Sequence, residues 1–527
     1  MKIINTAILR ICLLAFMMMP VWASAQSYYA DVNCDGDVSI SDVTDLIDIL
    51  LGNNGATSGN GGTNRGVISI KDYGAVGDGV TDDTEAMERA FADAARLQVS
   101  LYVPSGTYII RRPLTIKSGM EIYGDGANSI IKKTPAAWHK LTDKINKGVY
   151  NNDEYHTITL KVDGIDGYHV GDHCYISFSD NPFVPTYANS RARFCTFGEI
   201  YEINDTPIVE DSITKYEVKI RSAYDSVWHG TVSNHPADAT LSTSFPIMRS
   251  WSYKDECNDV YIHDLCLDGN RQTNGPTYNG VTYEPMEWTN GCIHFDASYK
   301  ETVNPNTIPY NKHSYNHIIE RCRLVNASFD GISDQGEGGL IVRDCEIENN
   351  AMHGIHLGTT FTDAVIRNNK MTGNGVRGAG VFFCQDATNV IVENNNISGF
   401  NHACSDEEYA SAGKFIIIRD NTIDNITGYV FDFMAATASK RGGGLQIFDN
   451  TISKLKNSLF YGDHLDNLIL ANNMITSIAK TPSTLVIVIS SNNAIITGNQ
   501  IPSGASVPAY INSSNTTNLI NAGNSWN

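Results

Sequence analysis

The stretch Ile366-Arg-Asn-Asn369-Lys-Met371 decides the fold, because its pattern recurs along the C-terminal half of the chain. The pattern is an apolar residue, two variable residues, Asn or Cys, one variable residue and a second apolar residue. It occurs at 319–324, 342–347, 366–371, 392–397, 418–423, 447–452, 470–475 and 496–501. Its central residues are Cys322, Cys345, Asn369, Asn395, Asn421, Asn450, Asn473 and Asn499. They lie 23, 24, 26, 26, 29, 23 and 26 positions apart, so this half of the chain is a repeat.

A period of this length, with several short β-rich segments in each unit, predicts a stacked solenoid. Leucine-rich repeats have a similar period but require a Leu-x-x-Leu-x-Leu pattern, which this sequence lacks. We therefore predict an all-β fold, a right-handed parallel β-helix in which like side chains stack between coils. The repeated Asn is then a buried amide ladder that satisfies turn backbone groups, and Cys322 and Cys345 occupy the same slot.

The repeat is preceded by a motif that starts near Val67. Apolar residues at helical spacing predict a helix from Thr84 to about Leu97. The motif Asp72-Tyr-Gly-Ala-Val-Gly-Asp-Gly79, followed by Asp82-Asp-Thr84, resembles the pectate-lyase-like superfamily, which includes rhamnogalacturonase-type and tailspike β-helices. The resemblance covers residues 67–527 and implies that the helix caps the N-terminal end of the β-helix. It leaves the reaction open, because lyases, hydrolases, epimerases and transferases share this fold.

The repeat is interrupted between about residues 132 and 251, where strand-like segments predict an inserted β-subdomain. This insertion contains Arg191, Arg193, Arg221 and Arg249, and Lys254 follows it. Two interpretations remain open: a basic wall that suits an anionic substrate, or scattered solvated arginines. A second insertion, at residues 270–315, is rich in Tyr and Asn and suits stacking on sugar rings.

The N-terminal residues 1–25 predict a signal peptide, because basic residues precede an apolar run and an Ala-Ser-Ala cleavage site. We expect export to the periplasm, the cell surface or the medium of a bacterium. The apolar run is too short to span a bilayer, and no later run predicts a transmembrane segment. The chain has 38 basic and 58 acidic residues among 527, a net charge of −20, which disfavours nucleic-acid binding.

Residues 26–52 contain an EF-hand-like calcium loop followed by an apolar helical pattern. The segment resembles a single type I dockerin repeat, which implies bound calcium and a cohesin-like partner. Dockerins normally carry two repeats, and one is present here. The alternative is an acidic surface loop without metal. The expected calcium ligands are Asp31, Asn33, Asp35, Asp37 and Asp42. Residues 53–66 then predict a flexible linker.

A second strand is predicted after the repeat phrase, at residues 291–296, 330–335, 353–358, 379–384 and 429–433. Because side chains alternate across a strand, the outward residues stack into a column at about 4.8 Å per coil. This column contains His294, Ser333, His356 and Phe382, and Asp330 and His353 form a neighbouring column. We predict an open polysaccharide-binding face here. The alternative is a set of surface histidines that bond to neighbouring coils.

The residues of this face and the cations beside it are the candidate site. The candidate catalytic residues are His294, His356, His353, Asp334, Glu337 and Asp330. The candidate substrate-binding residues are Arg249, Lys254, Arg271, Asp296, Ser333, Gln335 and Phe382.

The residue types favour a lyase that acts on an acidic, uronic-acid-containing polysaccharide, such as a glycosaminoglycan or a pectin-type chain. β-Elimination needs a base for the C5 proton and a cation at the adjacent carboxylate. Hydrolysis needs two carboxyl groups about 5–10 Å apart. Polygalacturonase-type hydrolases are similar only at His353-Gly354, and their Asn-Thr-Asp, Asp-Asp and Arg-Ile-Lys motifs are missing. A glycoside hydrolase and a non-catalytic glycan-binding β-helix remain the alternatives.

Overall fold

The chain divides into two compact units, Met1–Gly66 and Val67–Asn527. The structure is a computed structural model that describes residues 66–526, except for 144–148, 151–154, 178–195, 224–239, 244, 251–255, 274–276, 279–280, 283–289, 296–313, 359–360, 376, 385–386, 407–413 and 435–440. The predicted signal peptide, the dockerin-like repeat with all its expected calcium ligands, and nearly all of the linker lie outside the described residues. None of the helices within the described ranges has the length and apolar character needed to cross a membrane.

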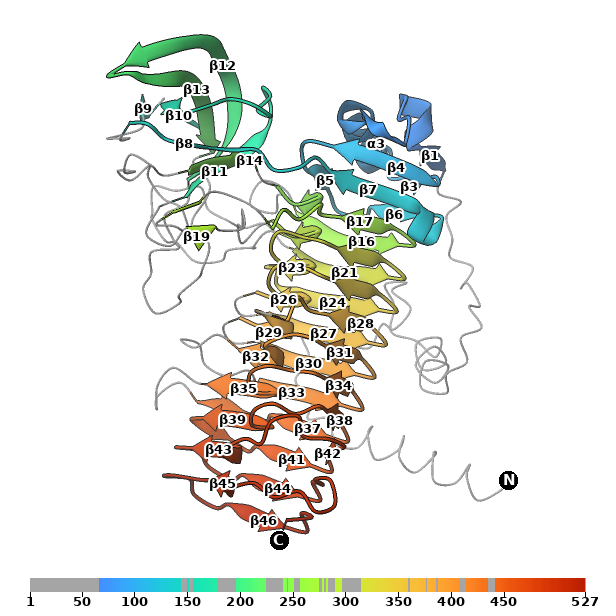
Figure 1. Ribbon diagram of the computed structural model, residues 1–527. Coiled ribbons are helices and arrows are strands. Elements are labelled where there is room, and N and C mark those ends of the chain that lie inside the picture. The colour runs from blue at the N-terminus through green and yellow to red at the C-terminus, as the bar shows by residue number, and fades with distance from the viewer. Residues whose placement is uncertain are drawn as a thin grey trace. The chain divides into compact units, whose positions relative to one another are not determined.

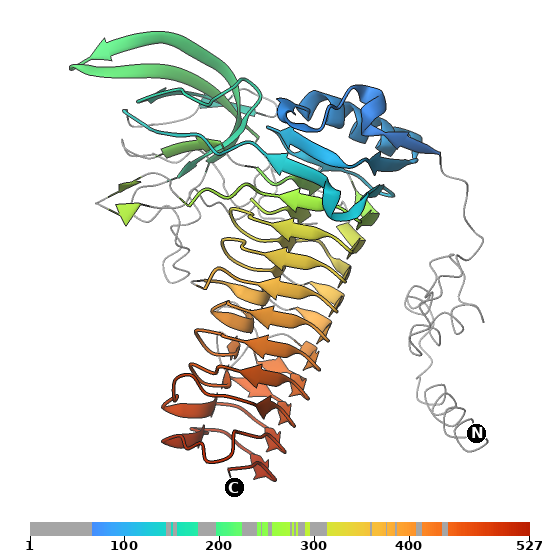
Figure 2. The same cartoon turned by 45° about the vertical axis from the view of Figure 1, so that its right-hand side comes forward.

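The second unit is a right-handed parallel β-helix whose rungs stack from the end near α3 (Thr84–Leu97) down to β46 (Ile520–Ala522), as Figures 1 and 2 show. Three sheets, here named A, B and C, run along it, and every neighbouring pair of strands within them is parallel. Buried apolar side chains from all three sheets form one continuous core between them. The predicted fold is therefore confirmed in the described residues.

Sheet A has fifteen strands among the described residues. They are β1 (Val67–Ser69), β3 (Ser100–Val103), β6 (Glu121–Gly124), β16 (Cys257–His263), β21 (Ser314–Glu320), β24 (Gly338–Arg343), β27 (Thr362–Arg367), β30 (Thr388–Glu393), β33 (Lys414–Arg419), β36 (Gly442–Gly443), β37 (Gln446–Phe448), β40 (Leu465–Asp466), β41 (Ile469–Ala471), β44 (Ile495–Thr497) and β46.

Sheet B contributes eleven strands to the described part of the chain. They are β2 (Asp78–Asp82), β4 (Gly106–Ile110), β7 (Ser129–Lys133), β17 (Cys266–Asp268), β22 (Arg323–Val325), β25 (Glu346–Glu348), β28 (Lys370–Thr372), β31 (Asn396–Ser398), β34 (Thr422–Asp424), β38 (Thr451–Ser453) and β42 (Met474–Ile475).

Sheet C, which carries the candidate site, also has eleven strands in the ranges that the structure describes. They are β5 (Leu114–Ile116), β15 (Met248–Ser250), β20 (Ile293–Phe295), β23 (Ile332–Asp334), β26 (Ile355–Leu357), β29 (Ala379–Phe383), β32 (His402–Asp406), β35 (Phe431–Met434), β39 (Phe460–Asp463), β43 (Thr484–Ile489) and β45 (Ala509–Asn512).

The corner between sheets A and B explains the repeat phrase. A residue with positive φ turns the chain just before the slot, for example Asn368 (φ 56°), Asn394 (φ 54°) and Asp420 (φ 55°). Asn and Asp tolerate this left-handed conformation better than other non-glycine residues do. The following Asn points inward and is buried, as Asn369 and Asn395 show. In the paired Asn-Asn and Asp-Asn sequences, the first residue therefore forms the turn and the second fills the buried slot.

The predicted amide ladder is confirmed. Each side-chain amide donates to the side-chain oxygen of the next rung at 2.9–3.0 Å, through Asn369, Asn395, Asn421, Asn450, Asn473, Asn499 and finally Asn524. Each oxygen also accepts a backbone N–H, as Asn421 does from Asn395 at 2.9 Å. Cys345 lies in the same slot, because its N–H donates to the Asn369 oxygen at 3.0 Å.

The N-terminal end of the solenoid carries the motif that precedes the repeat. The helix α3 lies at this end of the β-helix, and its apolar face, with Met87 and Phe91, joins the core. Asp83 accepts the N–H groups of Val76 (2.6 Å) and Gly77 (3.0 Å), which ties the motif to the start of the helix. Gly77 is required because its φ is +67° and an added Cβ would lie 2.5 Å from the Tyr108 ring.

The predicted insertion forms a separate antiparallel sheet, here named sheet D, beside the first rungs (Figure 1). Its strands are β8 (Trp138–Lys140), β14 (Thr240–Thr243), β11 (His173–Ser177), β12 (Thr196–Glu210), β13 (Ile213–Ala223), β10 (Tyr155–Val162) and β9 (Val149–Tyr150). It has its own apolar core, which includes Ile158, Ile176 and Leu241. A short two-stranded sheet, β18 (Thr277–Tyr278) and β19 (Val281–Thr282), lies in the second insertion.

Replacing Asn421 by Ala should destabilise the β-helix, because it leaves the Asn395 N–H and the Val392 carbonyl without the partners that Asn421 provides. We expect a loss of about 2 to 3 kcal/mol in the free energy of unfolding, measured by denaturant titration. The control is Asn396→Ala, since this exposed Asn lies next to the ladder; its effect should stay below about 0.5 kcal/mol. Equal losses in both variants would contradict the ladder's role.

Candidate functional site

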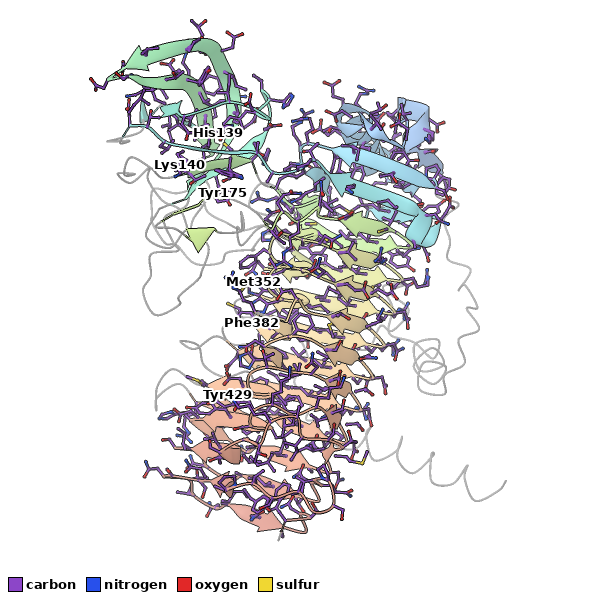
Figure 3. The ribbon with its side chains drawn as sticks, in the orientation of Figure 1. His139, Lys140, Tyr175, Met352, Phe382 and Tyr429 are labelled. Atoms are coloured by element: carbon purple, nitrogen blue, oxygen red, sulfur yellow. The ribbon has the colours of Figure 1, made fainter. Side chains whose placement is uncertain are left out.

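The parallel register of sheet C aligns the predicted outward residues. Arg249 pairs with His294, His294 with Ser333, Ser333 with His356, and His356 with Phe382. We call these five residues the outer column. Figure 3 shows Phe382 on this flank of the solenoid, with Met352 before it and Tyr429 beyond it along the axis. The predicted alignment is confirmed, and Arg249 extends it by one rung.

The prediction that this column forms an open face is wrong. His294 and Ser333 are fully buried, and His356 and Phe382 are 7% and 5% exposed. Aromatic packing explains part of this burial: the Phe382 ring stacks on His353 with centroids 4.1 Å apart and meets the edge of His356 at 4.9 Å. Arg249 remains half-buried. The alternative, histidines bonded between coils, describes the geometry of His356 and His353 better.

His356 and Asp330 form a buried ion pair between neighbouring rungs. The Asp330 Oδ2 lies 2.9 Å from the His356 Nδ1, and its Oδ1 accepts the His353 N–H at 3.0 Å. Burial opposes protonation of His356, but the Asp330 carboxylate and the nearby Cys384 thiol outweigh it and raise its pKa to about 10. His356 is therefore an imidazolium at neutral pH.

His353 has the opposite protonation state, although it lies only three residues away. The Ala379 N–H donates to the His353 Nδ1 at 3.0 Å, so the ring proton is on Nε2. Burial lowers the pKa of His353 to about 3, and the charge of His356 acts in the same direction. The Nε2 atoms of His353 and His356 are buried and make no hydrogen bond to the described residues. Each Nε2 therefore carries a buried proton, and the Cys384 thiol interacts with the His356 ring.

Asp334 does not face the outer column. It is fully buried, and its Oδ2 lies 2.7 Å from the Nδ1 of His317, which is also fully buried. The His317 Nε2 lies 3.0 Å from the Cys257 carbonyl oxygen, so both ring nitrogens donate. Burial opposes this charge, but Asp334 raises the pKa of His317 to about 10. The predicted catalytic carboxylate thus connects sheet C to sheet A and lies away from the outer column.

The remaining predicted residues are dispersed. Gln335 donates to the Ser333 Oγ at 3.0 Å, and Glu337 is half-buried just before β24. Arg271 donates to the backbone and side-chain oxygens of Asn349, both at 3.1 Å, at the corner between sheets B and C. Lys254 and Asp296 lie outside the described residues.

The expected basic wall is largely neutralised where sheet D is described. Its cations pair with carboxylates at 2.7–3.1 Å: Lys161 with Glu210, Lys215 with Asp143, Lys219 with Glu202 and Arg221 with Glu199. Arg191 and Arg193 lie outside the described ranges. Sheet D approaches the column through His173, whose pKa is lowered to about 3 by burial and by the guanidinium groups of Arg249 and Arg112. Arg249 itself belongs to β15 of sheet C and is thus the cation of the column that sheet D faces.

Sequence reasoning missed the rung formed by β32. Ala379 pairs with His402, so His402 continues the column of Asp330 and His353. Its Nδ1 lies 2.9 Å from the Tyr429 carbonyl oxygen, and burial lowers its pKa to about 4. The segment His402-Ala-Cys-Ser-Asp406 lacks the Gly and the β-branched residue of the other rungs. His402 follows Ala379 by 23 residues, which is one repeat period, and this spacing identifies the rung in the sequence.

Comparisons with known proteins agree with this architecture. Residues 67–168 match the family model described as rhamnogalacturonase A/epimerase, pectate lyase-like, and residues 306–475 match the right handed beta helix region. These matches support the pectate-lyase-like, right-handed β-helix superfamily.

Individual relatives match over short segments of the chain, and a solved structure matches most of it at low sequence identity. A mannuronan C5-epimerase of Azotobacter vinelandii is 35% identical over 94 residues, 16% of this chain and 9% of that protein. A glucan 1,3-beta-glucosidase of Cochliobolus carbonum is 46% identical over 57 residues, 9% of this chain and 7% of that protein. The chain thus spans less than a tenth of these curated relatives. An exopolygalacturonase structure from Thermotoga maritima has 13% identity and a TM-score of 0.49, covering 86% of this chain and 92% of that one.

Replacing Asp330 by Asn should remove the charge of His356 at neutral pH. The carboxylate that raises the pKa is then lost, whereas burial still lowers it. In the wild type, this pair stabilises the fold fully below about pH 6.5, and its contribution falls as the pH rises towards 10. Histidine NMR titration should show His356 protonated at pH 8 in the wild type and neutral in the variant. The control Asp344→Asn changes an exposed carboxylate and should leave this titration unchanged.

Proposed function

We propose that this protein acts on an acidic polysaccharide and cleaves it by β-elimination next to a uronate residue. Its superfamily and the named relatives that modify or hydrolyse polysaccharides support a polysaccharide substrate. The observation that carries the proposal is the buried Asp330–His356 pair, which keeps a cation in the outer column at neutral pH. A fixed imidazolium is suited to pair with a substrate carboxylate.

Arg249 gives the column a second cation, three rungs from His356 along the register. Neutralising a uronate carboxylate makes the C5 proton more acidic, so a cation at this place promotes elimination. His294 lies between these two cations, one rung from Arg249, but its side chain is fully buried and is not placed to contact the substrate. The imidazolium of His356 then binds the carboxylate of another uronate along the chain.

Hydrolysis by paired carboxylates fits these contacts less well. Asp330 uses both oxygens for His356 and for the backbone of His353, and Asp334 is bound to His317. Neither carboxylate is placed to protonate a glycosidic oxygen or to activate water. Glycosaminoglycans and pectin-type chains both carry the uronate that the proposal requires.

Incubation of the full-length protein with a panel of uronate polysaccharides should release products with the ultraviolet absorbance of an unsaturated uronate. His356→Gln should lower kcat/KM about 100-fold, because it replaces a fixed cation by a neutral amide. His263→Gln on sheet A is the matched control and should retain activity. Reducing ends without this absorbance would indicate hydrolysis, and sugar binding without any product would indicate a non-catalytic β-helix; both results would contradict β-elimination.

We also propose that the chain is exported and that the dockerin-like loop binds calcium and a cohesin-like partner. Loop positions with Asp, Asn and Gly support calcium binding. Isothermal titration of the full chain with calcium should show one high-affinity site that Asp35→Ala removes and that Asp344→Asn, in the second unit, leaves intact. Equal calcium binding by both variants would contradict this assignment.

A further inference from the structure

Cys384 differs from the other cysteines in the described part of the chain. Cys174, Cys257, Cys266, Cys292, Cys322, Cys345 and Cys404 are all buried, whereas Cys384 is half-buried. Burial alone raises the pKa of the Cys404 thiol, on the next rung, well above its usual range. Such a thiol is inert, because the thiolate is the nucleophile. Among these cysteines, Cys384 is therefore the one that a solvent-borne reagent can reach.

The backbone register places Cys384 beside His356. Phe382 pairs with His356, and the Cys384 N–H donates to the Leu357 carbonyl oxygen at 2.8 Å. Cys384 follows Phe382 by two residues, so alternation puts its side chain on the same outer side of the sheet as Phe382 and His356. The thiol is close enough to His356 to act on the protonation of that ring.

His356 is held in the way that a base for a thiol requires. Its Nδ1 lies 2.9 Å from the buried Asp330 carboxylate, which fixes the orientation of the ring and stabilises its charged form. Its Nε2 is buried, and the Cys384 thiol interacts with this ring. A nucleophile, an imidazole and a carboxylate that orients the imidazole are the parts of a nucleophilic triad.

His353 adds a donor to this group. Its Nδ1 accepts the Ala379 N–H, so its proton is on Nε2. That Nε2 is buried and has no hydrogen-bond partner within the described ranges. The His353 and His356 rings lie 5.5 Å apart, and Phe382 contacts both. A preorganised buried N–H beside a nucleophile is suited to a developing oxyanion.

We propose that Cys384, His356 and Asp330 form a nucleophilic triad for acyl esters, with the His353 Nε2–H as oxyanion donor. The Cys384 thiolate attacks the ester carbonyl carbon, the bond to the alcohol oxygen breaks, and the His356 imidazolium protonates the leaving oxygen. Neutral His356 then takes a proton from water, the hydroxide attacks the thioester, and the carbon–sulfur bond breaks. The acid, the thiolate and the imidazolium are thereby restored. The identification of the ester as an O-acyl group on a glycan rests on the proposed function. The reactivity assigned to the Cys384 thiol is independent of that function.

The first test measures alkylation of Cys384 in the full-length protein with iodoacetamide between pH 5 and 9, followed by mass spectrometry. A thiolate–imidazolium pair should react at pH 6 about 10- to 100-fold faster in the wild type than in Asp330→Asn. The wild-type rate should change little between pH 6 and 8, and the surface variant Asp344→Asn should follow it. A wild-type rate that rises tenfold per pH unit up to about pH 8.5, as for an ordinary thiol, would overturn the proposal.

The second test uses 4-nitrophenyl acetate as the acyl ester. We expect a burst of about one equivalent of nitrophenol per protein and an acetyl group on Cys384, found by peptide mass spectrometry. His353→Gln should slow acetylation at least 10-fold more than it slows alkylation, because alkylation forms no oxyanion. Fast alkylation without acetyl-Cys384 would overturn the acyl-transfer assignment. Acetyl transfer by a protein that cleaves no uronate polymer would contradict the proposed β-elimination alone.

Discussion

The in-register stacking of rungs is the constraint on which the rest of this protein depends, and the buried Asn ladder fixes it. Each amide accepts and donates between rungs, so a shift of one residue would leave several buried polar groups unsatisfied. Because the register is fixed, residues far apart in sequence, such as Arg249 and Phe382, share one column. The candidate site is a consequence of this stacking.

Opposite protonation of two neighbouring histidines gives the site its chemistry. His356 and His353 are both buried, yet Asp330 accepts from the ring of one and only from the backbone of the other. The carboxylate keeps His356 charged, and the Ala379 N–H selects the neutral tautomer of His353. The ring centroids of the two histidines lie 5.5 Å apart, so one residue type provides both a cation and a neutral donor. The buried ion pair between rungs and the Ala379 N–H together produce this asymmetry.

Asp334 shows how a carboxylate assigned to the outer face from sequence can lie inside the fold. It follows Ser333 on the same strand, but alternation turns it inward, where His317 from sheet A neutralises it. A buried carboxylate needs such a partner, and His317 carries no mark in the sequence that distinguishes it from a surface histidine. The arginines and lysines of the insertion were similarly ambiguous, since their acidic partners lie on neighbouring strands of sheet D.

The sequence by itself determined the β-helix, the Asn ladder, the α3 helix and the alignment of His294, Ser333, His356 and Phe382, because these follow from local periodicity and strand alternation. It could not determine burial, protonation or the pairing of Asp330 with His356, because those depend on side chains packed from neighbouring rungs. The position of Cys384 beside His356 is of the same kind. Composition and spacing decide which residues share a column; only the folded chain decides which of them carry charge.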